Sequence, residues 1–495
     1  MKGFGEKNQS KIKKISQNKQ TVNSDQLIKK AFELQSRGRK VEAAKYYLYL
    51  IKQKIKDYRV FSNYGIYLKE IGQHKEAELK LKKAIEFNPK YANAYYNLGC
   101  LYIDQGNLIK AEIFLRKAIE LKSDFAYAHY NLGFILKDLG RLKESETYNR
   151  KALEVDPELT DAYLSLSTIN ASDTNQKWEN QLFSEHLLKN KNNRELVNIF
   201  FARSNICHKK GKYAESAENL VTANSLKLKM HKSNAKLLIL KTNQLKAITN
   251  NIKNNYQKFS KNPISIFIVG LPRCGSTLIE SIISLNNKVK DLGEVNIFEE
   301  AFEECRKSKH DLDISEAYRN KIRILNNQTT ITTNKWLFNY QYAGIIAKTI
   351  PNAKIIHCYR NPLDNILSIY RAHFAKGNTF SSSLIDCAKV YFDQEEIMEN
   401  YKIQFRKQIY DLNYDNLVTN PSKEIKSLIS WLDWDWNKTY LSPHLNKRKV
   451  LTRSNVQVRT PINSKSVGGW KNYKEMLQPA IEIITQKVKY KDLIY

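Results

Sequence analysis

A glycine-containing segment in the second half of the chain has the residue types of an anion-binding turn. It reads Gly270-Leu-Pro-Arg-Cys-Gly-Ser-Thr277 and lies between a short apolar run and a stretch with apolar residues at helical spacing. At such a turn, backbone N–H groups and the positive end of the following helix can hold an anion, and glycines allow it to come close. Arg273 adds a positive charge from inside the segment. The segment therefore predicts a site for a phosphate or a related anion.

A second segment combines an arginine, a turn and a serine in a similar setting. Arg360-Asn361-Pro362 follows another apolar run, and Ser368 lies on the helix expected after the proline. An arginine can contact a phosphate through two N–H groups at once, and a serine hydroxyl can add a third hydrogen bond. Alone, an Arg-Asn-Pro turn is most simply structural, so the interpretation of this segment depends on the first one.

The first segment differs from the ATP-binding loop in one decisive residue. Its frame resembles G-x-x-x-x-G-K-[ST], but Ser276 occupies the position of the lysine. Without that lysine the β- and γ-phosphates of ATP lose their usual charge partner. A P-loop kinase is therefore an alternative that the sequence disfavours, and preference for ATP in a binding titration would revive it.

Together the two segments resemble the donor-binding motifs of sulfotransferases. The pattern P-R-x-G-[ST]-T resembles their 5′-phosphosulfate loop, and R-[DN]-P-x(5)-S resembles their 3′-phosphate segment. The resemblance implies the donor 3′-phosphoadenosine 5′-phosphosulfate (PAPS) and a mechanism without a metal. It implies that the 3′-phosphate is bound by Arg360 and Ser368. It further implies that the phosphosulfate end is bound by Arg273, Cys274, Gly275, Ser276 and Thr277. The family usually has serine where this chain has Cys274, so a weak thiol would replace a hydroxyl contact.

Further positions resemble the tyrosylprotein sulfotransferase branch. Glu294, in Gly293-Glu294, matches its catalytic glutamate, and Lys335 matches its catalytic lysine. The resemblance implies that Glu294 accepts the proton of the acceptor hydroxyl, while Lys335 and Arg273 stabilise charge as the nucleotide departs. Near the C-terminus, residues 459–470 resemble the closing loop of the family. There Ser466 would contact the leaving group, and Arg459 and Lys471 would touch the nucleotide.

Two further features are assigned to packing. The segment Tyr414-Asp415-Asn416-Leu417, with Asn420-Pro421 after it, also matches a family segment, and we assign it to the core. The same assignment is made for Trp431, Trp434 and Trp436.

Several functions are compatible with these motifs. Protein tyrosine is the first acceptor, because the glutamate and lysine follow the protein-tyrosine branch, and a hydroxyl of a carbohydrate or glycolipid is the second. A different class is a repeat scaffold whose nucleotide-binding domain is inactive, and Cys274 keeps that class open.

Strands that alternate with helices must position these residues. Residues 264–269, 329–333, 354–359 and 409–414 read as strands, and residues 276–285 and the stretch with Leu363, Leu367, Tyr370 and Phe374 read as helices. Asn420-Pro421 is expected to open another helix. This alternation predicts an α/β, P-loop-like sulfotransferase domain with a mainly parallel sheet over residues 261–495.

The first part of the chain is a tandem repeat. Gly38, Gly72, Gly106 and Gly140 recur at a step of 34 residues, and Ala43, Ala77 and Ala111 keep the same step. This period is typical of helix–turn–helix units, in which glycine permits the turn and a small residue permits close helix packing. The pattern resembles tetratricopeptide repeats and predicts an all-α superhelix over residues 25–170. Its concave face is expected to bind a protein partner or the substrate.

The remaining segments carry less information. Residues 171–260 are predicted to be a helical connector with one degenerate repeat around Gly211-Lys212-Tyr213-Ala214. Residues 1–24 are predicted to be a basic, disordered tail without the apolar core of a secretory signal.

Composition narrows the class of protein. The net charge is +31, but no basic motif interleaved with aromatic residues occurs, so we expect solvated lysines and an anionic cofactor rather than nucleic acid. The six cysteines are widely spaced without a C-x-x-C pair, which predicts neither a disulfide framework nor a zinc site. No apolar stretch is long enough to cross a bilayer. We therefore expect a cytoplasmic protein.

Overall fold

The computed structural model describes residues 24–169, 177–252, 264–307, 313–325, 331–374, 377–446 and 457–494. Contacts within the chain define two compact units, residues 1–135 with 154–156 and residues 136–153 with 157–495. The tail predicted for residues 1–24 lies outside the described residues except for Ser24.

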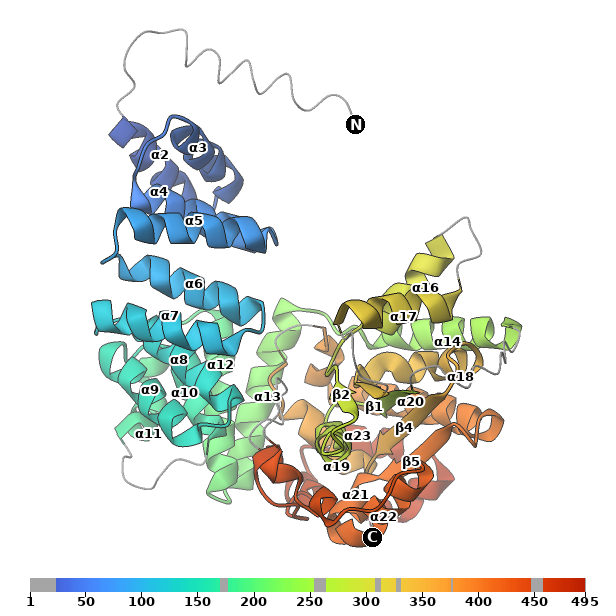
Figure 1. Cartoon of the computed structure of the whole chain (residues 1–495). Helices are drawn as coiled ribbons and strands as arrows, with labels where there is room; N and C mark the ends of the chain where they lie inside the picture. The colour runs from blue at the N-terminus through green and yellow to red at the C-terminus, as the bar shows by residue number, and fades with distance from the viewer. Residues whose placement is uncertain are drawn as a thin grey trace. The chain divides into compact units, whose positions relative to one another are not determined.

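The first unit consists of helices that pack in sequence order, drawn blue to cyan in Figure 1. They are α2 (Ser24–Ser36), α3 (Lys40–Lys52), α4 (Tyr58–Glu70), α5 (His74–Phe87), α6 (Ala92–Asp104), α7 (Leu108–Leu121) and most of α8 (Ala126–Asp138). The helices α9 (Leu142–Val155) and α10 (Thr160–Thr168) follow in the chain and belong, except for residues 154–156, to the second unit. The predicted alternation of helix and short turn over the repeat region is confirmed.

The repeat residues have the two roles that their period predicts. All four turn glycines, Gly38, Gly72, Gly106 and Gly140, have φ between +69° and +81°, where a side chain would be strained. A Cβ atom on Gly65 would lie 2.8 Å from Leu81 Cγ. The same distance would separate a Cβ on Gly99, one repeat later, from Leu115 Cγ. The repeat therefore requires glycine both for its turn and for close contact between paired helices.

The connector helices share a core with the second unit. They are α11 (Lys177–Leu182), α12 (Asn193–Lys209), α13 (Tyr213–Met230) and α14 (Ala235–Asn251). Gly211, at φ +73°, forms the turn between α12 and α13, as the degenerate repeat predicts. Phe201, Leu220 and Leu245 belong to the same buried cluster as Phe267 of the sheet. These helices are thus integral to the folded unit that contains the sheet.

The second unit is built on a five-stranded sheet whose strands all run parallel. The strands are β1 (Ile264–Gly270), β2 (Val289–Asp291), β3 (Ile331–Asn334), β4 (Ala353–Tyr359) and β5 (Ile409–Asn413), in the order β2-β3-β1-β4-β5. Four of them match the predicted strands, although residues 329 and 330 lie outside the described residues. The strand β2 is not predicted, because three residues with one exposed lysine have no recognisable pattern.

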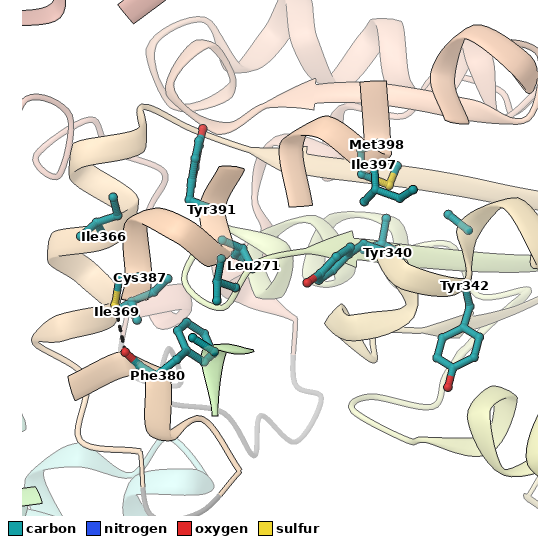
Figure 2. Packing of buried hydrophobic residues seen from close by; sticks show 14 of the residues in the cluster. Leu271, Tyr340, Tyr342, Ile366, Ile369, Phe380, Cys387, Tyr391, Ile397 and Met398 are labelled. Carbon is teal, nitrogen blue, oxygen red and sulfur yellow. Dashed lines mark hydrogen bonds between the residues drawn. The ribbon is translucent and has the colours of Figure 1, made fainter. Parts of the chain in front are cut away.

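Alternating residues of the central strands face two separate cores. Phe267 and Val269 of β1 lie in one buried cluster, whereas Ile266 and Ile268 lie in another. This is the period of two that a strand covered on both faces must have. Figure 2 shows part of the first cluster, in which Leu271, immediately after β1, lies among residues of the surrounding helices. The start of the anion-binding segment is therefore anchored in the core.

Helices cover both faces of the sheet (Figure 1). They are α15 (Ser276–Ile283), α16 (Ile297–Lys307), α17 (Ile314–Leu325), α18 (Ala343–Thr349), α19 (Pro362–Tyr370), α20 (Leu384–Gln404), α21 (Tyr414–Thr419), α22 (Pro421–Trp431) and α23 (Gln478–Ile484). Among the described residues, no helix has both the length and the apolar character needed to cross a membrane.

Two details differ from the sequence prediction. The helix α19 ends at Tyr370, before Phe374. Of the three tryptophans assigned to the core, Trp431 and Trp434 pack against the second buried cluster, but Trp436 is 39% exposed. The prediction is wrong for Trp436 because it follows the end of α22, where the chain runs along the surface.

Candidate active site

Most of the predicted site residues follow the carboxyl ends of the parallel strands β1, β2, β3 and β4. These ends meet at one edge of the sheet, where open α/β sheets bind their ligands. The strand order places the segment after β1 in the middle. On one side lies a group that we call the lysine side, which consists of Glu280, Glu294 and Lys335. On the other lies the arginine side, which consists of Arg360, Asp364, Tyr414, Asp415 and Ser466.

The central loop, residues 270–277, has a backbone that requires glycine at two positions. Gly270 has φ +148°, and a Cβ atom there would lie 2.3 Å from the carbonyl oxygen of Cys358. Gly275 has φ +98°, and its Cβ would lie 2.1 Å from Tyr414 Cδ2. Arg273 also adopts a left-handed conformation, at φ +69°, which costs a residue with a side chain about 1–3 kcal/mol. Strain of this kind is typical of a loop that is shaped for a ligand.

The helix α15 starts directly after Gly275, which serves as its N-cap. The first N–H groups of a helix have no partner within the helix, and they carry its positive dipole end. Ser276 and Thr277 occupy these first positions and are both buried. The loop and the helix start therefore have the backbone geometry that the predicted anion site requires, and binding of an anion there stays a prediction.

Cys274 is predicted to contribute a backbone N–H and a weak thiol to this cradle, and the structure buries its side chain. It is 1% exposed and packs in the second core beside Cys358 and Ile266. Its N–H donates to the carbonyl of Leu271 within the turn (3.3 Å). Burial raises the pKa of the neighbouring Cys358 thiol well above its ordinary value, so that thiol stays protonated. The thiol of Cys274 thus fills the core beneath the loop, because an apolar environment favours a thiol over the serine of the family pattern.

The lysine side contains a short ion pair. Lys335 Nζ lies 2.7 Å from Glu294 Oε1, and the lysine side chain is 1% exposed whereas that of Glu294 is 44% exposed. The backbone fixes this pair, since the N–H of Lys335 donates to the carbonyl of Gly293 (2.9 Å), beside the parallel pairing of β2 with β3. The structure therefore brings together the two residues that sequence comparison proposes for catalysis.

A second carboxylate completes the lysine side. Glu280 of α15 lies 3.9 Å from Lys335 Nζ and accepts a hydrogen bond from Thr333 Oγ1 (3.2 Å). Its side chain is 1% exposed.

The arginine side is centred on Arg360, which is 5% exposed. Its guanidinium lies 4.9 Å from the centre of the Tyr414 ring, and Nη2 donates to the carbonyl of Ser466 (2.8 Å). The carboxylates of Asp364 and Asp415 are each 3.7 Å away, beyond hydrogen-bond distance. Arg360 Nε is buried without a hydrogen-bond partner. This arrangement holds the cation in place, with Nε 3.7 Å from Asp415 Oδ1.

Helix α19 joins the central loop to the arginine side. Arg273 Nε donates to Ser368 Oγ (3.1 Å), and Asn365 Nδ2 donates to the carbonyl of Pro272 (3.0 Å). The other end of the Arg273 guanidinium donates to Gln457 Oε1 (2.8 Å). The two predicted anion-binding segments are therefore in direct contact.

The closing segment, residues 457–471, is held by a buried carboxylate. Asp364 accepts hydrogen bonds from the N–H groups of Gly468 (2.7 Å) and Trp470 (2.9 Å). Burial raises the pKa of Asp364, and these two hydrogen bonds only partly offset that effect. The side chain of Ser466 lies 3.4 Å from the Tyr414 hydroxyl. The segment thus packs onto α19 through its backbone.

Two further predicted residues lie in this segment. Lys471 is exposed, and Arg459 Nη1 donates to the carbonyl of Asn446 (3.0 Å). A contact of either residue with the nucleotide stays a prediction.

Sequence reasoning missed four residues of the site. Tyr414 and Asp415, which we assigned to packing, instead contact Gly275, Arg360 and the N–H of Asn361. Their position directly after β5 was the available signal. Glu280 and Asp364 lie inside helices, where only their buried position distinguishes them, and no sequence pattern marks that.

Comparisons with known proteins agree with this arrangement. A sulfotransferase-family model matches residues 263–438, and tetratricopeptide-repeat models match residues 80–113 and 126–159. The chain therefore carries a sulfotransferase-family domain behind tetratricopeptide repeats. The closing segment lies beyond the matched residues.

Two curated relatives resemble the second part of the chain. An uncharacterized protein of Aquifex aeolicus (strain VF5) is 32% identical over 253 residues, which are 46% of this chain and 33% of that protein. This chain thus spans about a third of that relative's length. Protein-tyrosine sulfotransferase 1 of Danio rerio is 22% identical over 238 residues, which are 43% of this chain and 67% of that protein.

Solved structures resemble each part separately. The sulfotransferase domain from the curacin biosynthetic pathway is 17% identical and covers 46% of this chain and 98% of its own, with a TM-score of 0.33. MamA is 20% identical and covers 37% of this chain and 96% of its own, with a TM-score of 0.26.

Proposed function

We propose that the sulfotransferase-family domain transfers the sulfuryl group of PAPS to an acceptor hydroxyl, with protein tyrosine as the first acceptor. The observation that carries the proposal is the ion pair between Glu294 and Lys335 (2.7 Å) beside a strained, anion-binding loop. A partly exposed carboxylate beside a buried cation suits a base that meets an incoming hydroxyl.

The proposed step is an in-line displacement at sulfur. The acceptor oxygen forms a bond to sulfur while the bond from sulfur to the phosphate oxygen breaks, and its electron pair leaves with adenosine 3′,5′-bisphosphate. Glu294 takes the proton of the acceptor hydroxyl. Lys335 and Arg273 stabilise the charge that develops on the departing oxygen. Holding both reactants in this geometry accounts for much of the expected acceleration.

The arginine side fits the 3′-phosphate of the donor. Its buried guanidinium has an Nε without a hydrogen-bond partner, and a doubly charged phosphate is a stronger acceptor than the carbonyl now bound to Nη2. In this proposal the hydroxyl groups of Ser368 and Ser466 add hydrogen bonds to the same phosphate. Recognition at both ends of the nucleotide is the feature that would separate PAPS from ATP, and it disfavours the kinase alternative.

Two features support the choice of a protein acceptor. The sequence resembles the protein-tyrosine branch at Glu294 and Lys335, and a protein-tyrosine sulfotransferase is among its relatives. The tetratricopeptide repeats suggest an interaction with a protein, which we propose to be the substrate or a partner. A hydroxyl of a carbohydrate or glycolipid is the alternative acceptor. We further propose that the protein acts in the cytoplasm.

Radiolabelled sulfuryl transfer is the direct test. The full chain is incubated with labelled PAPS and, separately, with tyrosine-containing peptides and a pool of glycans. Label in tyrosine supports the proposal, and label only in glycans selects the alternative acceptor. Absence of transfer together with absence of adenosine 3′,5′-bisphosphate binding in calorimetry would favour an inactive scaffold.

A further inference from the structure

A buried carboxylate on the lysine side has no role in the step described above. Glu280 points from α15 toward Lys335, whose Nζ lies 3.9 Å from Glu280 Oε2. Both side chains are 1% exposed, and Thr333 Oγ1 donates to the other carboxylate oxygen (3.2 Å). A buried charge is costly unless it is paired and hydrogen-bonded, so an acid at this position must be explained.

Lys335 is thus placed between two carboxylates of different character. The nearer one, Glu294 at 2.7 Å, is 44% exposed on its side chain and is open to an acceptor. The farther one, Glu280, is shielded from solvent and cannot meet an acceptor. Only one of the two is therefore able to exchange protons with a substrate.

The proposed reaction changes the charge of the nearer carboxylate. When Glu294 takes the proton of the acceptor hydroxyl, it becomes neutral and no longer balances the ammonium group of Lys335. At the same moment that ammonium group must face the oxygen of the departing nucleotide. A buried cation that lost its partner would be strongly destabilised at the point where its position matters most.

We propose that Glu280 is the second counter-ion of Lys335 and holds the lysine in place once Glu294 is protonated. This inference rests on the proposed function, because it assigns the proton to Glu294. Glu280 contacts neither the donor nor the acceptor, so it acts as a positioning residue. Its hydrogen bond from Thr333 keeps the carboxylate oriented toward the end of β3.

Two thiols also lie close enough to feel the Lys335 charge, Cys274 of the central loop and Cys358 at the end of β4. Burial raises the pKa of the Cys274 thiol, but hydrogen bonds with Cys358 and Ser276 outweigh it and lower that pKa. The Cys358 thiol stays protonated because burial raises its pKa. The carboxylates that the structure pairs with Lys335 are Glu280 and Glu294.

The test is a double-mutant cycle of thermal stability on the full chain. Glu294→Gln imitates the protonated state of Glu294, and Glu280→Gln removes the second charge while keeping the shape. Because the carboxylates substitute for each other, each single change should cost little, whereas the pair leaves Lys335 buried without a counter-ion. The melting temperature of the double variant should fall by about 4 °C or more beyond the sum of the single changes.

Tryptophan fluorescence reports the relevant unit by itself. All six tryptophans lie in the second unit, so selective excitation follows its unfolding without a signal from the first. Glu280→Asp is the matched control, since it keeps the charge, and combined with Glu294→Gln it should restore most of the lost stability. Additive losses in the Gln cycle would overturn the proposal, because a merely structural glutamate would not interact with Glu294.

Transfer kinetics give the second readout. Glu280→Gln should lower kcat about tenfold with little change in the KM for PAPS. Glu280→Asp should recover part of the lost kcat. An unchanged kcat would also overturn the proposal. Absence of transfer by the unaltered chain would count against the proposed function, whereas the stability cycle still tests the two-carboxylate pairing independently.

Discussion

The two sides of the candidate site are held together in different ways. On the lysine side, a backbone hydrogen bond at the ends of two adjacent strands joins Lys335 to Gly293. This bond places the side chains of Lys335 and Glu294 close enough to form their short ion pair. On the arginine side, hydrogen bonds from side chains hold the closing segment. Arg360 and Asp364 bind the backbone of a closing segment that follows them by about a hundred residues in the chain.

This difference teaches how binding and chemistry are divided. A pair fixed by strand register is present before any ligand arrives, which suits a catalytic base and its cation. A clamp that depends on a distant segment can open and close around a nucleotide. We therefore expect changes on the lysine side to alter kcat and changes on the arginine side to alter affinity.

The largest effect should come from Glu294→Gln. The amide keeps the shape of the side chain but cannot accept the acceptor proton, so kcat should fall by at least about a hundredfold. The affinity for adenosine 3′,5′-bisphosphate, measured by calorimetry, should stay within about twofold, because the arginine side is intact. Near-normal transfer rates would remove Glu294 from the mechanism.

A change on the arginine side should weaken nucleotide binding more than it lowers kcat. Arg360→Met keeps much of the side-chain volume and removes the cation, so the bisphosphate should bind about thirtyfold more weakly. At saturating PAPS the rate should drop much less. Arg360→Lys is the matched control and should recover only part of the affinity, since lysine lacks the bidentate donors. If Arg360→Met lost kcat but not affinity, the division between the two sides would be wrong.

A smaller and pH-dependent effect is expected for Asp364→Asn. The amide accepts hydrogen bonds less strongly than a carboxylate and carries no charge, so the closing segment should loosen and bisphosphate affinity fall about tenfold. The raised pKa of Asp364 determines in which direction the affinity changes with pH. The carboxylate is needed in its ionised form, and it is lost at a higher pH than an ordinary aspartate as the solution is acidified.

Calorimetry of both proteins between about pH 8 and pH 5 checks this dependence. The advantage of the unaltered chain over the Asn variant should shrink toward the acid end. The ligand's own titration is the same in both and cancels in the comparison. A constant ratio of affinities would show that Asp364 does not act through its charge.

The smallest effect should belong to Tyr414→Phe. The ring that covers Gly275 and stacks on Arg360 remains, and only the contact of the hydroxyl with Ser466 (3.4 Å) is removed. Bisphosphate affinity should change less than about threefold. A much larger loss in the same titration would assign the hydroxyl a direct part in binding.

The sequence predicted the central loop and the residues after the strands for a physical reason. Gly270, Lys335 and Arg360 each lie at the end of a stretch that reads as a strand, and parallel strands bring such positions to one edge. The repeat helices were predictable from their period, because each copy repeats the same contacts.

Residues whose role depends on a distant partner escaped prediction. In the sequence, Glu280 is one polar position on the helix α15. It is buried beside Lys335, which lies far along the chain and which no local pattern connects with it. Asp364 likewise depends on Gly468 and Trp470. The direction of the Cys274 side chain was also unpredictable, since it is set by the tight turn that Gly270 and Gly275 allow.

A titration with two nucleotides measures whether one site recognises both ends of the ligand. If one site binds a nucleotide through two separate anionic groups, the unaltered chain should bind adenosine 3′,5′-bisphosphate at least about tenfold more tightly than AMP. Arg360→Met should abolish that preference. Equal affinity of the unaltered chain for both nucleotides would contradict the account.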